Sequence, residues 1–318
     1  MHVRKAVITA AGRGARQYPA SDTVAKAMLP LVDRDGLTKP VIQIIGEEAL
    51  DSGIEEIGIV CAPGDESAYR QHLAALGENL KSQPDSPLAA EQAERLAELE
   101  RRLHFAVQEQ PAGYGHAVWC AKSFVGREPF LLLVSDHLYI SGEKQRCARQ
   151  VLDLADHEAC SVAGVQATRE HLIGRYGTVA GKRLSGQVFQ IERVIEKPTP
   201  SVAEQQLHVP GLRVGHYLCF FGIHVLTPAI FDILDEHVRA GHREGGEIQL
   251  TPALQELAKR ERYLAVQTNG RRYDIGVRFG VLEAQIALAM AGVDRDEVLA
   301  RLMELVLQVE QERGRGTA

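Results

Sequence analysis

The first residues with potential for chemistry follow a short apolar run near the start of the chain. Lys5 to Ala10 has the length and composition of a buried strand, and Gly12 and Gly14 come directly after it. Glycines allow backbone conformations closed to other residues, and successive N–H groups in such a loop form a nest for an anion. Arg16 can grip phosphate with a planar fork, and Lys26 supplies a compact point charge. The stretch therefore indicates phosphate binding.

Two common glycine loops are excluded by the residues around this one. A dinucleotide-binding loop needs a third glycine where this chain has Gln17, and an acidic residue at the end of the next strand. That strand, predicted from Glu56 to Cys61, is followed by Ala-Pro. A Walker A loop would close with Gly-Lys-Ser or Gly-Lys-Thr, which is missing here. A purely structural turn remains the alternative to a phosphate loop.

Charged residues end two later strands. Phe130 to Val134 is the clearest central strand, and Asp136 follows it, where a carboxylate would suit Mg²⁺ bridging phosphate oxygens. A helix cap or turn explains Asp136 equally well from spacing alone, and His137 is more typical of a packed or solvated turn. Glu196 and Lys197 end another strand. They are either a solvated strand edge or a carboxylate that accepts a hydroxyl group beside a lysine that binds phosphate.

A second glycine loop lies between these two features. Gly113 and Gly115 would let a ligand approach the backbone, and a helix predicted over Ala117 to Ser123 would point its N-terminus at the same spot. Gln108 or Gln110 offers a donor and an acceptor on one amide, which suits the imide edge of a pyrimidine. By itself, an ordinary turn explains this stretch as well as a binding site does.

Composition limits the class of protein. The chain has 318 residues, of which 45% are hydrophobic and 25% charged, which is ordinary for a globular protein of α/β size. The net charge of −6 argues against a nucleic-acid partner, and no apolar run is long enough to span a membrane. The five cysteines contain no Cys-x-x-Cys pair, which predicts reduced and mostly buried thiols. With no signal peptide before the first strand, we expect a cytoplasmic protein.

The order of elements predicts an α/β fold with right-handed parallel crossovers. Gly174 to Ala180 is predicted as a turn region before an antiparallel strand over 187–195. Thr251 is a good N-cap for a helix from Pro252 to Lys259. A final amphipathic helix, Val293 to Gln311, packs on its own domain or makes an oligomer contact. The other predicted strands are 5–10, 56–61, 103–108, 130–134, 159–165, 215–225 and 263–267, and the other predicted helices are 41–50, 67–76, 88–103, 117–123 and 279–290.

Taken in order along the chain, these motifs resemble the sugar-phosphate nucleotidylyltransferases, and within them the bacterial UTP–glucose-1-phosphate uridylyltransferases. The family's opening motif is Gly-x-Gly-Thr-Arg, followed by a lysine in a Lys-x-(Met/Leu)-Leu-Pro context. The matching residues span roughly 3 to 290; they are Gly12, Gly14, Arg16, Lys26, Leu29, Pro30, Gly113 to Ala117, Asp136, Tyr176-Gly177, Glu196 to Pro198, Gly246 to Thr251 and Asp274 to Gly276.

The resemblance implies a Rossmann-like fold of the nucleotide-diphospho-sugar transferase type, in which helices flank a mixed, mainly parallel central sheet. It implies a nucleotidyltransferase domain over 1–292, with a nucleotide-binding half at about 1–140 and a sugar-phosphate-binding half at about 141–292. A C-terminal helix would occupy 293–318. The implied reaction is nucleotidyl transfer from UTP to glucose 1-phosphate, giving UDP-glucose and pyrophosphate, with Mg²⁺ as cofactor.

The resemblance also implies a role for each matched residue. Arg16 and Lys26 would be catalytic and would offset charge on the α-phosphate and the leaving group. Asp136 and Asp274 would hold Mg²⁺. We expect UTP and a sugar 1-phosphate as partners, in a homo-oligomer. The implied nucleotide-binding residues are Ala11, Gly12, Gly14, Gln108 and Gly113, and the implied sugar-phosphate-binding residues are Gly177, Glu196, Lys197 and Gly215.

The chain departs from the family pattern at several positions. Ala15 stands where the family has threonine, Asp22 where uridylyltransferases often carry lysine, and Ala27 where the family has glutamate. Residues 34–38 look inserted, and Pro252 replaces an acid. The alternatives are therefore the same chemistry with another sugar 1-phosphate or dTTP, or a non-catalytic regulatory paralogue that binds a sugar nucleotide.

Overall fold

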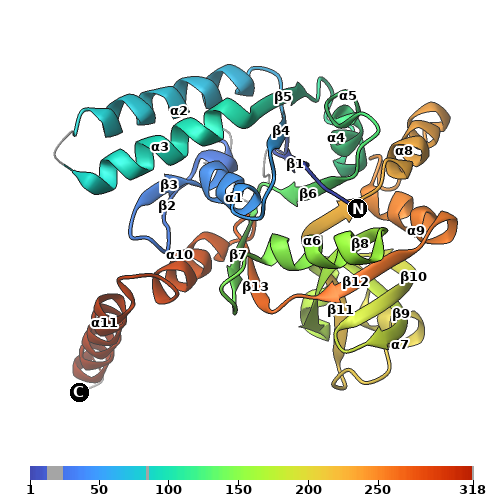
Figure 1. Ribbon diagram of the computed structural model, residues 1–318. Helices are drawn as coiled ribbons and strands as arrows, with labels where there is room; N and C mark the ends of the chain where they lie inside the picture. The colour runs from blue at the N-terminus through green and yellow to red at the C-terminus, as the bar shows by residue number, and fades with distance from the viewer. Residues whose placement is uncertain (13–23, 84–85, 317–318) are drawn as a thin grey trace.

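A computed structural model describes residues 1–12, 24–83 and 86–316 of the protein (Figure 1). In this part of the chain, the main sheet has nine strands in the order β5-β4-β1-β6-β11-β8-β12-β10-β9. Two small sheets pair β2 with β3 and β7 with β13. The strands are β1 (Lys5–Thr9), β2 (Pro30–Val32), β3 (Thr38–Pro40), β4 (Glu56–Cys61), β5 (Leu103–Val107), β6 (Phe130–Val134), β7 (His137–Ser141), β8 (Ser161–Arg169), β9 (Gly177–Ser185), β10 (Val188–Glu196), β11 (His216–Leu226), β12 (Tyr263–Gln267) and β13 (Gly270–Asp274).

Helices cover both faces of this sheet because its central strands are apolar on both sides. Ala6 and Ile8 of β1 pack into one core together with α1, α2, α3, α6 and α10. Val7, between them, packs into a second core with α4, α5, α8 and α9. The helices are α1 (Val41–Leu50), α2 (Asp65–Lys81), α3 (Pro87–Arg102), α4 (Tyr114–Cys120), α5 (Lys122–Val125), α6 (Cys147–Glu158), α7 (Pro200–Gln206), α8 (Ala229–Ala240), α9 (Leu250–Arg260), α10 (Gly280–Met290) and α11 (Arg295–Gly316), with short 3₁₀ helices η3 (Lys26–Met28) and η4 (Glu170–Arg175).

The parallel part of the sheet brings three strand ends to one edge. β1 lies between β4 and β6 and runs parallel to both, with Thr9 paired to Val60 and to Val134. The segments that leave these strands, including the one that carries Asp136, therefore start at the same edge. This is the edge at which open parallel sheets collect ligands.

The other part of the sheet is antiparallel and curls back on itself. β9 pairs with β10 along most of its length and also with β11, which belongs to the middle of the sheet. The curl lies at the lower right of Figure 1, together with α7. It places the start of β9 and the end of β10 beside β11, the strand next to β6.

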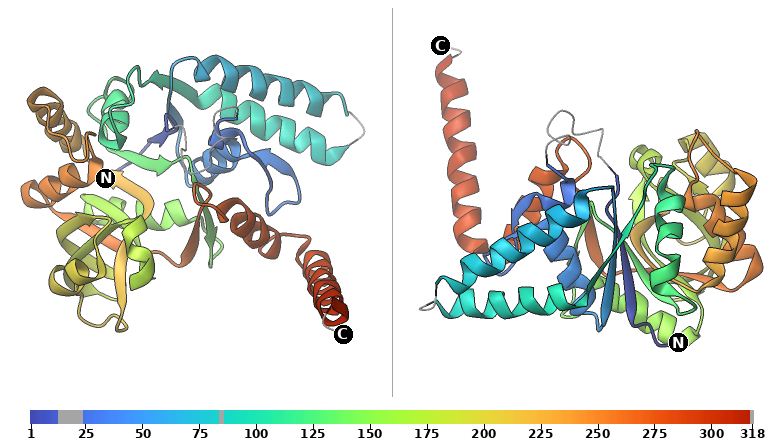
Figure 2. Two further views of the ribbon diagram at one scale, coloured as in Figure 1. Left: turned by 180° about the vertical axis from the view of Figure 1, so that it is seen from behind. Right: turned by 90° about the horizontal axis from the view of Figure 1, so that it is seen from above.

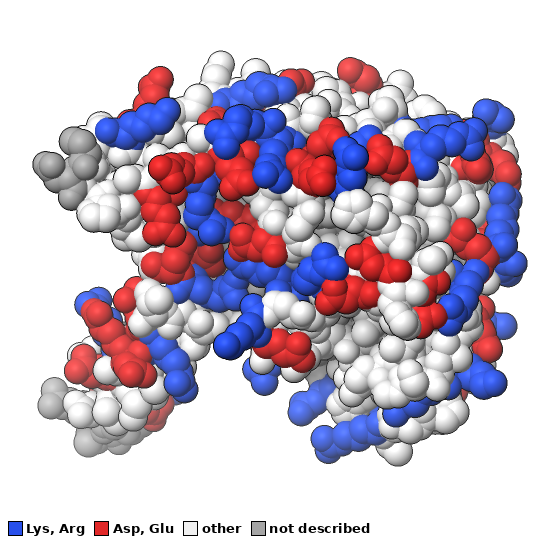
Figure 3. Space-filling view, viewed as in Figure 1, with Lys and Arg blue, Asp and Glu red and all other residues white. Residues whose placement is uncertain are grey.

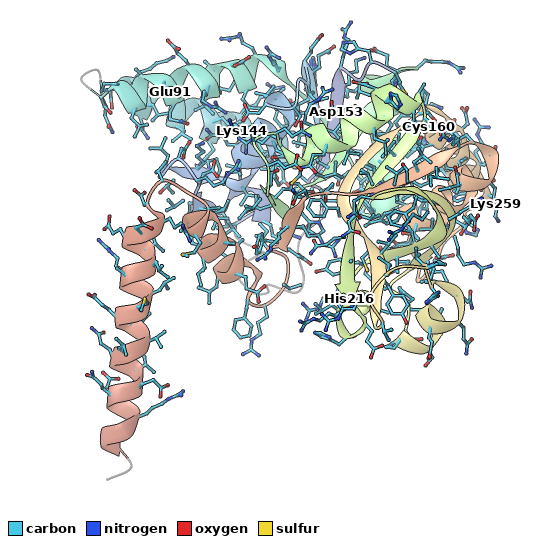
Figure 4. The ribbon with its side chains drawn as sticks, turned by 60° about the horizontal axis from the view of Figure 1, so that its bottom comes forward. Glu91, Lys144, Asp153, Cys160, His216 and Lys259 are labelled. Atoms are coloured by element: carbon cyan, nitrogen blue, oxygen red, sulfur yellow. The ribbon has the colours of Figure 1, made fainter. Side chains whose placement is uncertain are left out.

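The C-terminal helix α11 projects from the body. Figure 2 shows it as a rod that leaves the end of α10 and extends away from the sheet. Side chains stand out from it on all sides in Figure 4. Several large apolar side chains on this helix are exposed: Leu299, Met303, Leu305, Val306, Leu307 and Val309.

The predicted α/β class and mixed sheet are confirmed, and three local predictions are wrong. Residues 177–180 form the start of β9 instead of a turn, because this backbone pairs with both β10 and β11. Helix α4 starts at Tyr114, three residues earlier than predicted. Helix α9 starts at Leu250, so Thr251 lies inside the helix. Its hydroxyl donates to Glu196 and does not cap the helix.

The surface and the cysteines agree with the composition. The face shown in Figure 3 carries acidic and basic side chains interspersed, without a broad basic patch. All five cysteines are free thiols, and four of them are buried, as predicted. Among the described helices, none combines the length and the apolar character needed to cross a lipid bilayer.

Candidate active site

Lys26 and Asp136 meet at the edge where β1 and β6 end. Lys26 begins η3, and it is held in place by the neighbouring Ala27, which is 2% exposed. The Lys26 ammonium donates to Oδ2 of Asp136 at 2.8 Å. Both side chains are largely shielded, at 10% and 21% exposure, so the charges interact more strongly than an ion pair on the surface would. The two residues are 110 positions apart in sequence and come together through the sheet.

The β7–β13 pair brings Asp274 and His137 to the same place. His137 and Asp274 are direct partners in this antiparallel ladder. The Ile275 N–H donates to the Asp136 carbonyl at 2.9 Å, and the Gly276 N–H donates to Oδ1 of Asp274 at 2.8 Å. Ligand atoms of Asp136, His137 and Asp274 all lie within 4.8 Å of one another.

The chemistry of this cluster fits a divalent cation. Two carboxylates supply hard oxygen donors, which Mg²⁺ and Mn²⁺ accept, and the imidazole adds a nitrogen donor. Nδ1 of His137 is buried, and the ring interacts with the backbone of Phe221. Burial lowers the pKa of His137, while the Asp136 carboxylate acts in the opposite direction. A neutral imidazole of this kind is a competent metal ligand.

A second cluster, the sugar corner, consists of Gly177, Glu196, Lys197 and Thr251. The Thr251 hydroxyl donates to Oε2 of Glu196 at 2.6 Å, and the Lys197 ammonium lies 3.2 Å from Oε1 of the same carboxylate. Gly177 pairs with Glu196 across the β9–β10 ladder. A Cβ on Gly177 would come within 2.7 Å of the Phe220 ring and 3.2 Å of Glu196 Oε2. Gly177 therefore packs closely against Phe220 and Glu196, and the corner presents a carboxylate and a cation to one space.

Lys197 has an unusual backbone for a residue with a side chain. Its φ is +43°, in the left-handed region, and its N–H donates to the Tyr176 carbonyl at 3.1 Å. Strained backbone of this kind persists where surrounding structure holds it, and it is common at functional sites. Here it turns the chain sharply at the end of β10.

The second glycine loop is fixed by Gln108 and by the segment before α9. Gln108 is buried and its amide N–H₂ donates to the Gly113 carbonyl at 3.0 Å, with His116 Nδ1 at 3.0 Å. Gly113 has φ +112°, and a Cβ there would lie 2.6 Å from the Ile248 carbonyl oxygen. Gly115 N–H donates to the same oxygen at 2.8 Å. Gln108 is therefore tied into the loop, and this use of its donor was not foreseen from the sequence.

Three aromatic or cationic side chains connect the two clusters, and their roles were not predicted. The Tyr176 ring packs edge-on to His137 at 6.4 Å between centroids, and the Arg272 guanidinium stacks 3.5 Å from the Tyr176 ring centre. Arg272 also donates to the Phe220 carbonyl. Burial raises the pKa of Tyr114, and the carboxylates of Asp136 and Glu196 act on it in the same direction. Tyr114 therefore stays a neutral phenol close to both clusters.

The structure does not bring Gly215 to the sugar corner. Phe220 of β11 lies beside Gly177, whereas Gly215 is five residues before Phe220, roughly 16 Å along an extended chain at about 3.3 Å per residue. Figure 4 places the neighbouring His216 at the outer end of the curled sheet. The glycine of β11 that faces the site is Gly222, whose φ is +90° and whose Cβ would lie 2.5 Å from His137 Nδ1. An isolated glycine in an apolar strand is the sequence signal for such a close approach.

The opening loop is described only in part. Ala11 and Gly12 follow β1 at the ligand edge; Ala11 is buried, and no atom of a described residue lies within 4 Å of the Cβ position of Gly12. Gly14 and Arg16 lie outside the described residues, as do Ala15 and Asp22. Their predicted roles stay predictions.

Comparison with known proteins identifies the family. The family model for nucleotidyl transferases matches residues 5–289, which include every described residue of both clusters. The protein belongs to the nucleotidyl transferase family. Its curated relatives include the UTP–glucose-1-phosphate uridylyltransferase of Bacillus subtilis, 36% identical over 97% of this chain and 99% of the relative. The enzyme of the same name from Streptococcus pneumoniae is 38% identical over 91% of each chain.

A solved structure of a UDP-glucose pyrophosphorylase is also similar to this chain. A UDP-glucose pyrophosphorylase crystallised with UDP-glucose is 29% identical, with a TM-score of 0.72 over 90% of this chain and 98% of that one. These comparisons confirm the resemblance to bacterial UTP–glucose-1-phosphate uridylyltransferases that was inferred from the motifs. The residue roles within it rest on the geometry described above.

Proposed function

We propose that the protein transfers a uridylyl group from UTP to glucose 1-phosphate and so forms UDP-glucose and pyrophosphate. The observation that carries the proposal is one continuous site, in which the Lys26–Asp136 pair and Asp274 meet the Glu196–Lys197 corner through Tyr176 and His137. It occurs in a chain that aligns with UTP–glucose-1-phosphate uridylyltransferases over nearly its whole length.

The reaction needs positioning and charge stabilisation more than covalent help from the protein. An oxygen of the sugar phosphate attacks the α-phosphorus of UTP in line, and the bond to pyrophosphate breaks. The Lys26 ammonium offsets negative charge on the α-phosphate and on the leaving group, and Arg16 is proposed to act with it. Because Lys26 is already held by Asp136 in a shielded place, little reorganisation is needed when charge develops.

The proposed binding groups divide the substrates between the two clusters. Gln108, Gly113 and the backbone around Ala11 to Gly12, with Gly14, bind uracil, ribose and phosphates. Lys197 holds the phosphate of the incoming sugar. Glu196, fixed by Thr251, accepts a sugar hydroxyl, and Gly177 lets this carboxylate and Phe220 lie close to the β9 backbone.

We propose Mg²⁺ as the cofactor, with Asp136 and Asp274 as the residues that hold it. When bound, the ion would neutralise negative charge on the triphosphate. Support comes from the donor set of the Asp136 and Asp274 carboxylates at the end of β6.

The experiment that tests the substrate assignment is pyrophosphate release with Mg²⁺. UTP, dTTP, CTP and ATP would each be paired with glucose 1-phosphate, galactose 1-phosphate and N-acetylglucosamine 1-phosphate. The proposal expects the highest kcat/KM for UTP with glucose 1-phosphate. A higher value for dTTP, or for another sugar 1-phosphate, would replace this assignment by that pair.

We further propose that the protein forms a homo-oligomer. The support is α11, whose large apolar side chains are exposed on a helix that projects from the body. Light scattering should give a mass that is a multiple of 34.9 kDa. Deletion of residues 293–318 should reduce that mass toward the monomer. A full-length monomer at micromolar concentration would contradict the proposal.

We also propose a cytoplasmic location. The support is the state of the five cysteines, which are all free thiols. Free thiols are typical of reducing compartments. Fractionation of the native host with an antibody to the protein would test this location.

A further inference from the structure

One residue of the site has no use in the proposed reaction. His137 lies between the two carboxylates proposed to hold Mg²⁺, and the family pattern assigns only those two carboxylates to the metal. The sequence alone favoured a packed or solvated turn residue at this position. The structure instead puts a ligand atom of His137 within 4.8 Å of ligand atoms of both Asp136 and Asp274.

The fold sets the position of this side chain from two sides. His137 is the first residue of β7 and is paired in register with Asp274 of β13. On its other side, Gly222 of β11 has no Cβ, and one placed there would be 2.5 Å from Nδ1. The ladder between β11 and its neighbours is irregular between Phe220 and His224, which is how the Gly222 backbone comes to face the ring. A glycine is thus required for the imidazole to sit where it does.

One ring nitrogen of His137, Nδ1, is buried beside Gly222 of β11. The ring also forms a hydrogen bond with the Phe221 backbone. A ring nitrogen of His137 is the atom that lies within 4.8 Å of ligand atoms of Asp136 and Asp274. Among the described residues, the charged groups that act on the ring are these two carboxylates and Arg272. The Lys26 ammonium contacts Asp136, and the imidazole is the nitrogen donor of the cluster.

We propose that His137 is a third protein ligand of the metal and that the site therefore binds a divalent transition ion, Mn²⁺ or Co²⁺, more tightly than Mg²⁺, the proposed cofactor. This inference rests on the proposed function, since it concerns the ion of the same site. Oxygen-only sites suit Mg²⁺, whereas an imidazole nitrogen strengthens binding along the series from Mn²⁺ to Co²⁺. Asp136, Asp274 and His137 would supply a set of two carboxylates and one imidazole.

Direct spectroscopy of bound Mn²⁺ tests the ligand without turnover. Metal-free full-length protein would be given Mn²⁺, first alone and then with UTP but no sugar phosphate, and ¹⁴N coupling would be measured by electron spin-echo spectroscopy. The proposal predicts a directly bound imidazole signal in at least one of the two states. It also predicts that His137→Asn and His137→Asp lack the signal, and that Mn²⁺ affinity falls at least about tenfold in His137→Asn.

His157→Asn provides the matched control, because His157 is 81% exposed and lies on α6 away from the cluster. This variant should keep the signal and the affinity. A second comparison uses the ratio of Co²⁺ to Mg²⁺ affinity, which should fall in His137→Asp, where the donor set contains only oxygen. Bound Mn²⁺ without ¹⁴N coupling in either state, or coupling that survives in both His137 variants, would overturn the proposal. Turnover with Mg²⁺ is measured separately, so failure here leaves the uridylyl-transfer assignment testable.

Discussion

Loss of Lys26 should affect chemistry more than binding. Lys26→Ala removes the ammonium that neutralises charge developing on the α-phosphate and leaving group. We expect kcat to fall about a hundredfold or more, as for other preorganised charge stabilisers. Steady-state pyrophosphate release at saturating UTP and glucose 1-phosphate would measure it.

The control for this variant is Lys122→Ala. Lys122 also forms an ion pair with a carboxylate, Asp235, but it does so between α5 and α8, on the face covered by the second core. Turnover should be unchanged in Lys122→Ala. Unimpaired turnover in Lys26→Ala would remove Lys26 from the mechanism.

Thr251 is predicted to act as a positioning residue through Glu196. Thr251→Val removes the hydroxyl that donates to Glu196 at 2.6 Å. Because hydrogen bonds to charged groups are worth about 1.5–3 kcal/mol, the KM for glucose 1-phosphate should rise at least about tenfold while the KM for UTP stays the same. Initial-rate kinetics with each substrate varied in turn would measure both constants.

Rescue separates this role from general damage to α9. Thr251→Ser keeps the hydroxyl and should restore most of the affinity for glucose 1-phosphate. If the valine variant raised both KM values equally, or if serine failed to rescue, the contact with Glu196 would have no positioning role.

At the scale of elements, sequence patterns identified most strands and helices but missed contacts between them. The bounds of β4, β6, β12 and α1 are as predicted. Each of these elements is a continuous, mainly apolar segment with clear sequence signals at its ends. The β7–β13 pair was missed since its partners are far apart in sequence. For the same reason the motifs could suggest Asp136 and Asp274, but neither the Thr251–Glu196 bond nor the approach of Gly222 to His137.

The geometry of the second glycine loop can be tested by adding a single methyl group at Gly113. In Gly113→Ala the new Cβ would lie 2.6 Å from the Ile248 carbonyl oxygen, at a φ of +112° that alanine avoids. The loop would have to move, and Gln108 would lose its acceptor on Gly113. We expect the KM for UTP to rise at least about tenfold, equivalent to about 1.4 kcal/mol, measured by initial rates.

Gly186→Ala is the matched control for backbone strain alone. Gly186 lies in the β9–β10 turn at φ +47°, and no described residue comes within 4 Å of its Cβ position. This variant should lose some thermal stability but keep its KM for UTP. Equal effects of the two alanines on KM would mean that the contact with Ile248 is irrelevant.

For the whole molecule, one buried carboxyl group links folding stability to pH. Glu48 of α1 is 4% exposed, accepts from the Ala148 N–H of α6 at 2.9 Å, and thus joins two helices on one face of the sheet. Burial raises its pKa from 4.5 to about 7. Between these values the folded protein holds a proton that the unfolded chain has lost, so stability is full below about pH 4.5 and falls as pH rises through about 7.

Urea unfolding between pH 5 and pH 8 would measure this dependence. The free energy of unfolding of the wild type should fall by about 2.5 kcal/mol relative to Glu48→Gln over this range, because each pH unit between the unfolded and folded pKa values is worth about 1.4 kcal/mol. Glu91→Gln is the control, since Glu91 lies exposed on α3 (Figure 4). A wild type and a Glu48→Gln variant with parallel pH profiles would contradict the assignment.

The overall architecture could be anticipated because motif order carries information that single motifs lack. Gly12, Asp136, Glu196 and Asp274 are each weak signals, yet their sequence along the chain matches one family. The irregular path of β11 and the curl that pairs β9 with two strands follow from packing of the whole chain. No local pattern encodes such packing. This explains why the motifs pointed to Gly215 as a binding residue, whereas Gly222 is the glycine that faces the site.

The most direct test of the central claim is product formation by the purified protein. With UTP, glucose 1-phosphate and a divalent cation, pyrophosphate and UDP-glucose should appear in equal amounts, and Lys26→Ala should slow both together. If UDP-glucose binds but neither product forms with any nucleoside triphosphate and sugar 1-phosphate, the protein is a sugar-nucleotide-binding protein and the proposed reaction is wrong.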